Sequence, residues 1–93
     1  SKDALIDFNK TNLEIFNLVR AQSFPYKGAF FYNNKKKFRI IKCLRSKISP
    51  NLKYGTIFKF KGKKKMFIKC KTDSIIIENI KPNLKTLKKI KII

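Results

Sequence analysis

The sequence predicts an α+β fold, mainly β, with one N-terminal helix followed by five short strands that form a small closed or half-closed barrel. Three observations support this prediction. A helix-start signal and a helical apolar pattern occupy residues 11–22, the apolar period changes to two after the corner at residues 25–29, and tight-turn residues separate the later apolar runs. At 93 residues the chain has room for one such domain.

The helix is predicted to begin at Thr11, because Thr11 followed by Glu14 fits the capping box, in which each side chain hydrogen-bonds a backbone N–H of the first turn. It should end at residues 21–23, because Pro25 disfavours helical geometry at Phe24. Residues at helical spacing form the face that should cover the strands: Ile15, Leu18, Val19 and Gln22, with Leu13 and Phe16 beside them. On this face we expect burial of Ile15, Leu18 and Val19.

The five strands are predicted at residues 29–32, 38–45, 56–60, 66–71 and 75–80. Residues 46–55 form a connection, and Gly62 marks the turn of a hairpin between the third and fourth strands. In the second strand, alternation places Phe38, Ile40 and Leu44 on one face. The opposite face is mixed, and we expect it to be partly exposed: Arg39, Ile41, Cys43 and Arg45. After Pro82 the chain is predicted to form a short amphipathic helix or strand, or to fray.

The charge balance points to an anionic partner. Lys and Arg total 24 against 5 Asp and Glu, which gives a formal net charge of +19. Nucleic acid, a phosphorylated small molecule or an acidic protein would each fit, although a coding bias toward Lys, Ile, Asn and Phe also raises the charge without selection for binding. No apolar run approaches the ~20 residues of a membrane span, so we expect a cytoplasmic protein with no membrane partner.

The chain lacks the residues of most catalytic sites. It has no histidine, its 5 carboxylates form no evident pair, and its 3 glycines are too scattered for a phosphate-binding loop. Cys43 and Cys70 are isolated, so we expect two small buried hydrophobic residues rather than a disulfide or a metal site. We therefore predict no catalytic residues, no metal ligands and no enzyme activity for this chain alone.

Three motifs, in order, carry a resemblance to a known family. IDFN at residues 6–9, VRA at 19–21 and PYKGA at 25–29 resemble the junction at which folate-dependent formyltransferases pass from the catalytic domain to the C-terminal domain. YGTIFKF at 54–60 and KMFIKCKTDSIIIENIKP at 65–82 resemble later strands of the same family. The resemblance covers residues 5–82 and implies the family's C-terminal domain, an OB-like barrel, in agreement with the five predicted strands.

The resemblance implies a noncatalytic part of a larger enzyme. In that enzyme an upstream catalytic domain would transfer a formyl group from 10-formyltetrahydrofolate to an amino group, and this domain would position the acceptor or brace the catalytic domain. Residues 1–10 would be the linker from the preceding domain, residues 11–82 the helix and OB-like barrel, and residues 83–93 a basic tail. No cofactor is expected in this chain.

Several functions remain open at this point. The net charge favours tRNA, and thus methionyl-tRNA formyltransferase, although IENIKPNLKTLKKIKII at residues 77–93 replaces that enzyme's closing segment rich in Gln and Gly-Lys. The corner of Phe24, Pro25 and Tyr26 also occurs in relatives that formylate nucleotide-linked amino sugars. From another class, a freestanding basic OB-type nucleic-acid-binding module is the alternative.

The candidate residues for binding tRNA or another anionic acceptor are all basic: Arg20, Lys35, Lys36, Lys37, Arg39, Lys63, Lys64 and Lys65. Both lysine triplets are placed in turns, where they would be either solvated or part of a rim that contacts phosphates. Arg20 would either contact an interface or a ligand, or interact favourably with the negative end of the helix dipole. The nearby aromatics would either stack bases or pack in the core or between domains: Phe24, Tyr26, Phe30, Phe31 and Tyr32.

Overall fold

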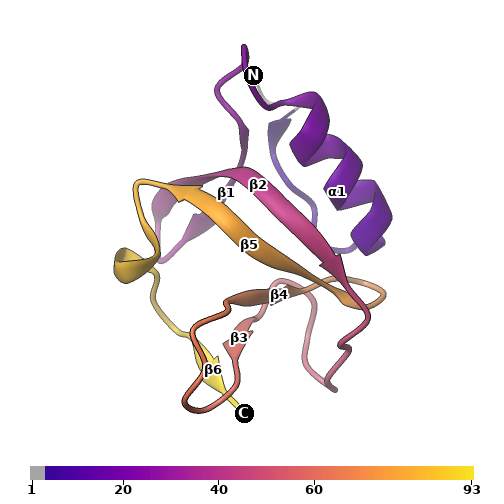
Figure 1. Ribbon diagram of the computed structural model, residues 1–93, viewed down its shortest axis with the longest axis vertical. Coiled ribbons are helices and arrows are strands. Elements are labelled where there is room, and N and C mark those ends of the chain that lie inside the picture. The colour runs from indigo at the N-terminus through magenta and orange to yellow at the C-terminus, as the bar shows by residue number, and fades with distance from the viewer. Residues whose placement is uncertain (1–3) are drawn as a thin grey trace.

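The structure is a computed structural model that describes residues 4–93, which form one α-helix and a six-stranded sheet (Figure 1). The elements are α1 (Asn12–Ala21), β1 (Ala29–Asn33), β2 (Lys36–Ser46), β3 (Ile57–Lys59), β4 (Phe67–Lys69), β5 (Ser74–Lys81), the short 3-10 helix η2 (Leu84–Thr86) and β6 (Lys91–Ile92). The predicted class, α+β and mainly β, is confirmed. Helix α1 packs on β2 and β5. Within residues 4–93, no helix has the length and apolar character needed to cross a membrane.

The sheet is open, with the strand order β1-β2-β5-β4-β3-β6. The prediction of a five-stranded OB-like barrel is therefore not confirmed: residues 91–92 add a sixth strand parallel to β3, and the outer strands β1 and β6 are not paired in the part of the chain that the structure describes. The side chain of Asn33, at the end of β1, instead connects this strand to the segment that precedes β6. The Asn33 amide donates to the Lys88 carbonyl at 3.0 Å and accepts from the Lys88 N–H at 2.7 Å.

Helix α1 begins as predicted. Thr11 Oγ1 accepts from the Glu14 N–H at 3.1 Å, and the Thr11 N–H donates to Glu14 Oε1 at 3.1 Å, which completes the capping box. Glu14 Oε1 accepts from the Thr11 N–H and also from the Thr11 hydroxyl at 3.1 Å, and these two bonds, the backbone one contributing most, hold the pKa of Glu14 below its usual value. Ile15 and Val19 are buried against the sheet, as predicted. The burial prediction is wrong for Leu18, which is only half-buried because it lies at the margin of the covered face.

Asn12, the first residue of α1, ties the helix to the sheet and is only 5% exposed. Its amide donates to the Ser46 carbonyl at 3.0 Å and to the Ser74 carbonyl at 3.2 Å, at the end of β2 and the start of β5. Ser46 and Ser74 are register partners. Both hydroxyls bond to the backbone of Ile48. The Ser46 hydroxyl accepts from the Ile48 N–H at 3.0 Å, and the Ser74 hydroxyl donates to the Ile48 carbonyl at 2.7 Å. One buried amide therefore joins three elements.

Strand β2 contains an irregularity that changes which of its residues are buried. Its register with β5 shifts between Ile40 and Lys42 and again between Lys42 and Cys43. Ile41 on β2 and Glu78 on β5 are each left without a register partner, and such an extra residue reverses the alternation of its own strand beyond it. Cys43 therefore lies in the core and Leu44 is 41% exposed, so the predicted faces are wrong for these two residues.

The packed core includes residues near both ends of the chain. Ala4 and Ile6 are buried, and the Ile6 N–H donates to the Phe30 carbonyl at 2.8 Å, which places this segment alongside β1. At the other end Leu87 is 5% exposed and belongs to the same hydrophobic cluster. Both terminal segments thus contribute apolar surface to the domain.

We predict that Ile15→Ala lowers the free energy of unfolding by about 2–5 kcal/mol, because the truncation leaves a cavity under α1. Leu13→Ala is the matched control on the outer side of the same helix, where Leu13 is 43% exposed, and should cost less than about 0.5 kcal/mol. Urea unfolding followed by circular dichroism measures both. Equal losses would show that α1 does not pack in this orientation.

Candidate functional site

A tight corner at residues 23–28 follows α1 and presents aromatic side chains to solvent. The Ser23 hydroxyl donates to the Arg20 carbonyl at 2.8 Å, and the Ser23 N–H donates to the same carbonyl at 3.3 Å, at the end of the helix where carbonyls need partners outside it. The Tyr26 N–H then donates to the Ser23 carbonyl at 3.0 Å. Phe24 is 92% exposed and Tyr26 is 65% exposed, which leaves both rings available for contact.

Arg39 on β2 supports this corner. Its Nη1 donates to the Gly28 carbonyl at 2.9 Å, and its guanidinium carbon lies 5.4 Å from the centroid of the Phe30 ring. Lys37 approaches the same ring at 4.4 Å. Gly28 has a φ of +108°, and a Cβ there would approach Ile41 Cδ1 to 2.9 Å, so the corner requires glycine at this place.

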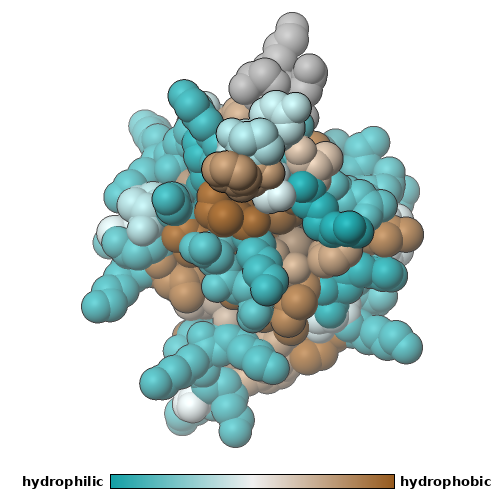
Figure 2. Space-filling model, turned by 45° about the horizontal axis from the view of Figure 1, so that its top comes forward, coloured by the Kyte–Doolittle hydropathy of each residue, from teal (hydrophilic) through white to brown (hydrophobic). Residues whose placement is uncertain are grey.

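Two adjoining grooves lie between the corner and the sheet. The first, between α1 and β2, has a volume of about 500 Å³ and is lined mainly by apolar side chains. The second, the corner groove, has a volume of about 450 Å³ and is lined by Ser23, Phe24, Tyr26, Lys27, Arg39, Ile41 and Lys81. Both volumes are in the range of small-molecule sites. Figure 2 shows the upper face of the molecule, where hydrophobic surface is exposed between hydrophilic side chains.

The structure brings two of the predicted binding residues to these grooves. Arg20 lines the groove beside α1, with its guanidinium 5.7 Å from the Phe16 ring, and Arg39 lines the corner groove. Sequence reasoning missed Lys27 and Lys81 as site residues. Lys27 lies within the PYKGA motif of residues 25–29, which the sequence already indicated. Lys81 lies beside Arg39 only because β2 pairs with β5, and no local sequence pattern reveals that pairing.

The two lysine triplets lie on separate hairpins. Lys35 is in the β1–β2 turn, but Lys36 and Lys37 are on β2 and not in the turn as predicted, because the turn contains only residues 34–35. Lys63–Lys65 are exposed in the β3–β4 connection. Strand β5 separates the two hairpins in the sheet. A single rim formed by both triplets stays a prediction.

The aromatic residues of segment 24–32 divide into two groups. Phe31 is buried in the core and stacks on Phe38 with ring centroids 5.8 Å apart, and Phe30 is buried on the opposite face of β1 beneath Lys37 and Arg39. The exposed rings are Phe24, Tyr26 and Tyr32. Of these, Phe24 and Tyr26 line the corner groove. Packing thus accounts for the buried aromatic rings, and only Phe24 and Tyr26 are both exposed and part of the corner groove.

Cys43 and Cys70 are free and buried, as predicted. Burial raises the pKa of Cys43 to about 11 and that of Cys70 to about 12. Both groups are therefore neutral thiols at physiological pH, and neither has the character of a nucleophile.

We predict that a thiol-reactive dye modifies neither cysteine in the folded protein at about pH 8, because a raised pKa removes the reactive thiolate and burial removes access. The same dye should label both cysteines in concentrated urea, which serves as the control. Counting dye per chain by mass spectrometry gives the result. Rapid labelling of the folded protein would contradict the buried placement.

This small sheet domain carries a groove in which basic and aromatic side chains lie together. Comparison with known proteins gives its family: the chain matches formyl transferase, C-terminal domain, over residues 1–92, and it belongs to this family. The catalytic domain of a formyltransferase is not part of this chain. The predicted resemblance is thereby confirmed.

A similar protein is the bifunctional polymyxin resistance protein ArnA of Wigglesworthia glossinidia brevipalpis. It is 44% identical to this chain over 78 residues. The match covers 82% of the present chain and 11% of ArnA, so the chain corresponds to a small part of the length of that relative.

Proposed function

We propose that this chain is the acceptor-positioning C-terminal domain of a formyltransferase that acts on the amino group of a nucleotide-linked sugar. A preceding catalytic domain would transfer the formyl group from 10-formyltetrahydrofolate, and we assign the folate donor to that domain. The observation that carries the proposal is the corner groove, which combines three cationic side chains with two exposed aromatic rings: Lys27, Arg39, Lys81, Phe24 and Tyr26.

The choice of a sugar acceptor over tRNA has two supports. The corner of Phe24, Pro25 and Tyr26 resembles the one found in relatives that formylate amino sugars. The similar protein bears a name that refers to polymyxin resistance and not to translation. The sequence-based preference for methionyl-tRNA rested on net charge, and neither comparison adds support for it.

We predict that the full-length enzyme containing this chain formylates a nucleotide-linked amino sugar with a kcat/KM at least about tenfold above that for methionyl-tRNA, a difference of about 1.4 kcal/mol. Mass spectrometry of the products measures both reactions. The isolated 93-residue chain, with no histidine, should transfer no formyl group to either acceptor and serves as the control. Preference for tRNA would overturn the proposal.

The net charge of +19 keeps tRNA as a second candidate, and salt dependence separates the two. A phosphate-binding rim would make tRNA affinity fall steeply with salt, because each neutralised duplex phosphate releases about 0.9 counterion. Replacing residues 35–37 or 63–65 with Gln would then flatten the slope. With a sugar acceptor, wild type and both triple variants should show equal slopes in a fluorescence titration of tRNA.

A further inference from the structure

We propose that the corner groove is a nucleotide subsite, in which the base stacks on Phe24 or Tyr26 and the diphosphate contacts Arg39, Lys27 and Lys81. The inference rests on the proposed function, in which the acceptor carries a nucleotide. It assigns part of acceptor recognition to this noncatalytic domain.

The first argument is an uncompensated pair of like charges in the sheet. Arg39 on β2 and Lys81 on β5 are direct register partners, an arrangement that is unfavourable when both side chains are cationic. Lys27 faces the same groove, and within residues 4–93 no carboxylate lines it. A bound anion would remove the repulsion and form charge-assisted hydrogen bonds with all three groups.

The second argument is the fixed orientation of Arg39. Its hydrogen bond to the Gly28 carbonyl and its position over the Phe30 ring hold the guanidinium in place before any ligand binds. A guanidinium has five N–H donors in a planar fork, and the bond to Gly28 uses only one of them. The remaining donors suit bidentate contact with phosphate oxygens.

The third argument is the exposure of the two corner rings. Phe24 is 92% exposed, so nearly all of its apolar surface meets water, and Tyr26 lies beside it on the same groove. A nucleobase stacked on either ring would cover this surface, and any of the bases could do so because each has a flat aromatic face. Rings and cations within one groove of about 450 Å³ match the two halves of a nucleoside diphosphate.

The position of the groove in the chain agrees with an acceptor site. A further hollow shares Tyr26, Lys27 and Arg39 with the corner groove and extends to Ala4. The preceding catalytic domain of the proposed enzyme would join the chain at this end. A nucleotide held here would therefore lie next to that domain, where its linked sugar could reach the catalytic residues.

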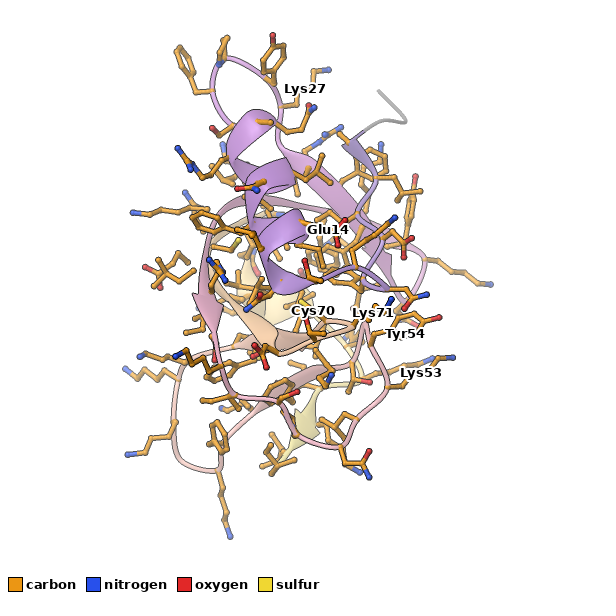
Figure 3. All side chains as sticks on the ribbon, turned by 90° about the vertical axis from the view of Figure 1, so that its right-hand side faces the viewer. Glu14, Lys27, Lys53, Tyr54, Cys70 and Lys71 are labelled. Carbon is orange, nitrogen blue, oxygen red and sulfur yellow. The ribbon has the colours of Figure 1, made fainter. Side chains whose placement is uncertain are left out.

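The test is an NMR titration of the 93-residue chain with uridine diphosphate and with adenosine diphosphate at about 150 mM salt, where long-range charge effects are screened. Inorganic pyrophosphate is the third probe and isolates the contribution of phosphate. The variants are Phe24→Ala, Tyr26→Ala and Lys81→Gln. The matched controls are Tyr54→Ala and Lys53→Gln. Tyr54 is exposed, Lys53 Nζ lies 6.0 Å from the centroid of its ring, and both residues lie away from Lys27 (Figure 3).

We expect both nucleotides to shift the amide signals of residues 23, 24, 26–28, 39–41 and 81. At least one of Phe24→Ala and Tyr26→Ala should weaken nucleotide affinity at least about fivefold through lost stacking, and both should leave pyrophosphate affinity unchanged. Lys81→Gln should weaken all three probes, and both controls should stay within about twofold of wild type. Unchanged amide spectra outside the groove would confirm that the variants fold.

Three results would overturn the subsite: no nucleotide binding at millimolar concentration, shifts spread evenly over the basic surface, or pyrophosphate affinity equal to that of the nucleotides. Groove signals that respond to the preceding domain in the full-length enzyme, but not to nucleotide, would likewise show an interdomain contact. None of these results tests the acceptor, which the transfer assay decides. Formylation of the sugar without groove binding would remove the subsite, and with it acceptor positioning by the corner groove, but would keep the nucleotide-linked sugar as the acceptor of the full-length enzyme.

Discussion

The side-chain amide of Asn12 is the interaction on which the arrangement of this domain depends. It donates to the carbonyls of Ser46 and Ser74, which lie 34 and 62 residues away along the chain. A buried carbonyl without a donor is costly, so the first turn of α1 is held where β2 ends and β5 begins. In the part of the chain that the structure describes, every buried side-chain nitrogen or oxygen has a hydrogen-bond partner. Sliding α1 along the sheet would break both bonds together.

The location of the corner groove follows from this anchor. Helix α1 has 10 residues, about 15 Å at 1.5 Å per residue, and runs back along β2 from the Ser46 end. The chain therefore leaves the helix over the earlier part of β2, where Arg39 and Ile41 line the groove with the corner residues. Gly28 allows the close approach, and its carbonyl binds Arg39. The helix thus positions the site without contributing a reactive group to it.

Local signals predicted the helix and the class of fold, and long-range pairing determined the rest. Thr11 and Glu14 fixed the helix start because the capping box lies within one turn. The bulge at Lys42 depends on register with β5 and leaves no local pattern, so the buried side of β2 beyond Ile40 could not be assigned. The two-residue strand β6 is too short for an alternation pattern. It is formed by pairing with β3 alone.

The candidate site likewise combines features that local sequence signals predict with features that only long-range strand pairing determines. The sequence indicates Arg39 only as one of several basic candidates, and it indicates the corner by its motif. The pairing of Arg39 with Lys81 joins residues 42 positions apart (81 minus 39), and only the sheet brings these two cations together. Phe31 is buried in the core on one face of β1, and Phe30 is buried on the opposite face beneath Lys37 and Arg39, whereas Phe24 in the corner is exposed.

Replacing Asn12 with Asp tests the central claim most directly, because Asp has nearly the same shape but cannot donate to the two carbonyls when ionised. Asn17→Asp on the exposed side of α1 makes the same chemical change where no buried partner is lost. Urea unfolding at about pH 7 should show that Asn12→Asp lowers the free energy of unfolding by at least about 2 kcal/mol. Asn17→Asp should lower it by less than about 0.5 kcal/mol. Equal losses in the two variants would contradict the claim that the Asn12 amide anchors the helix.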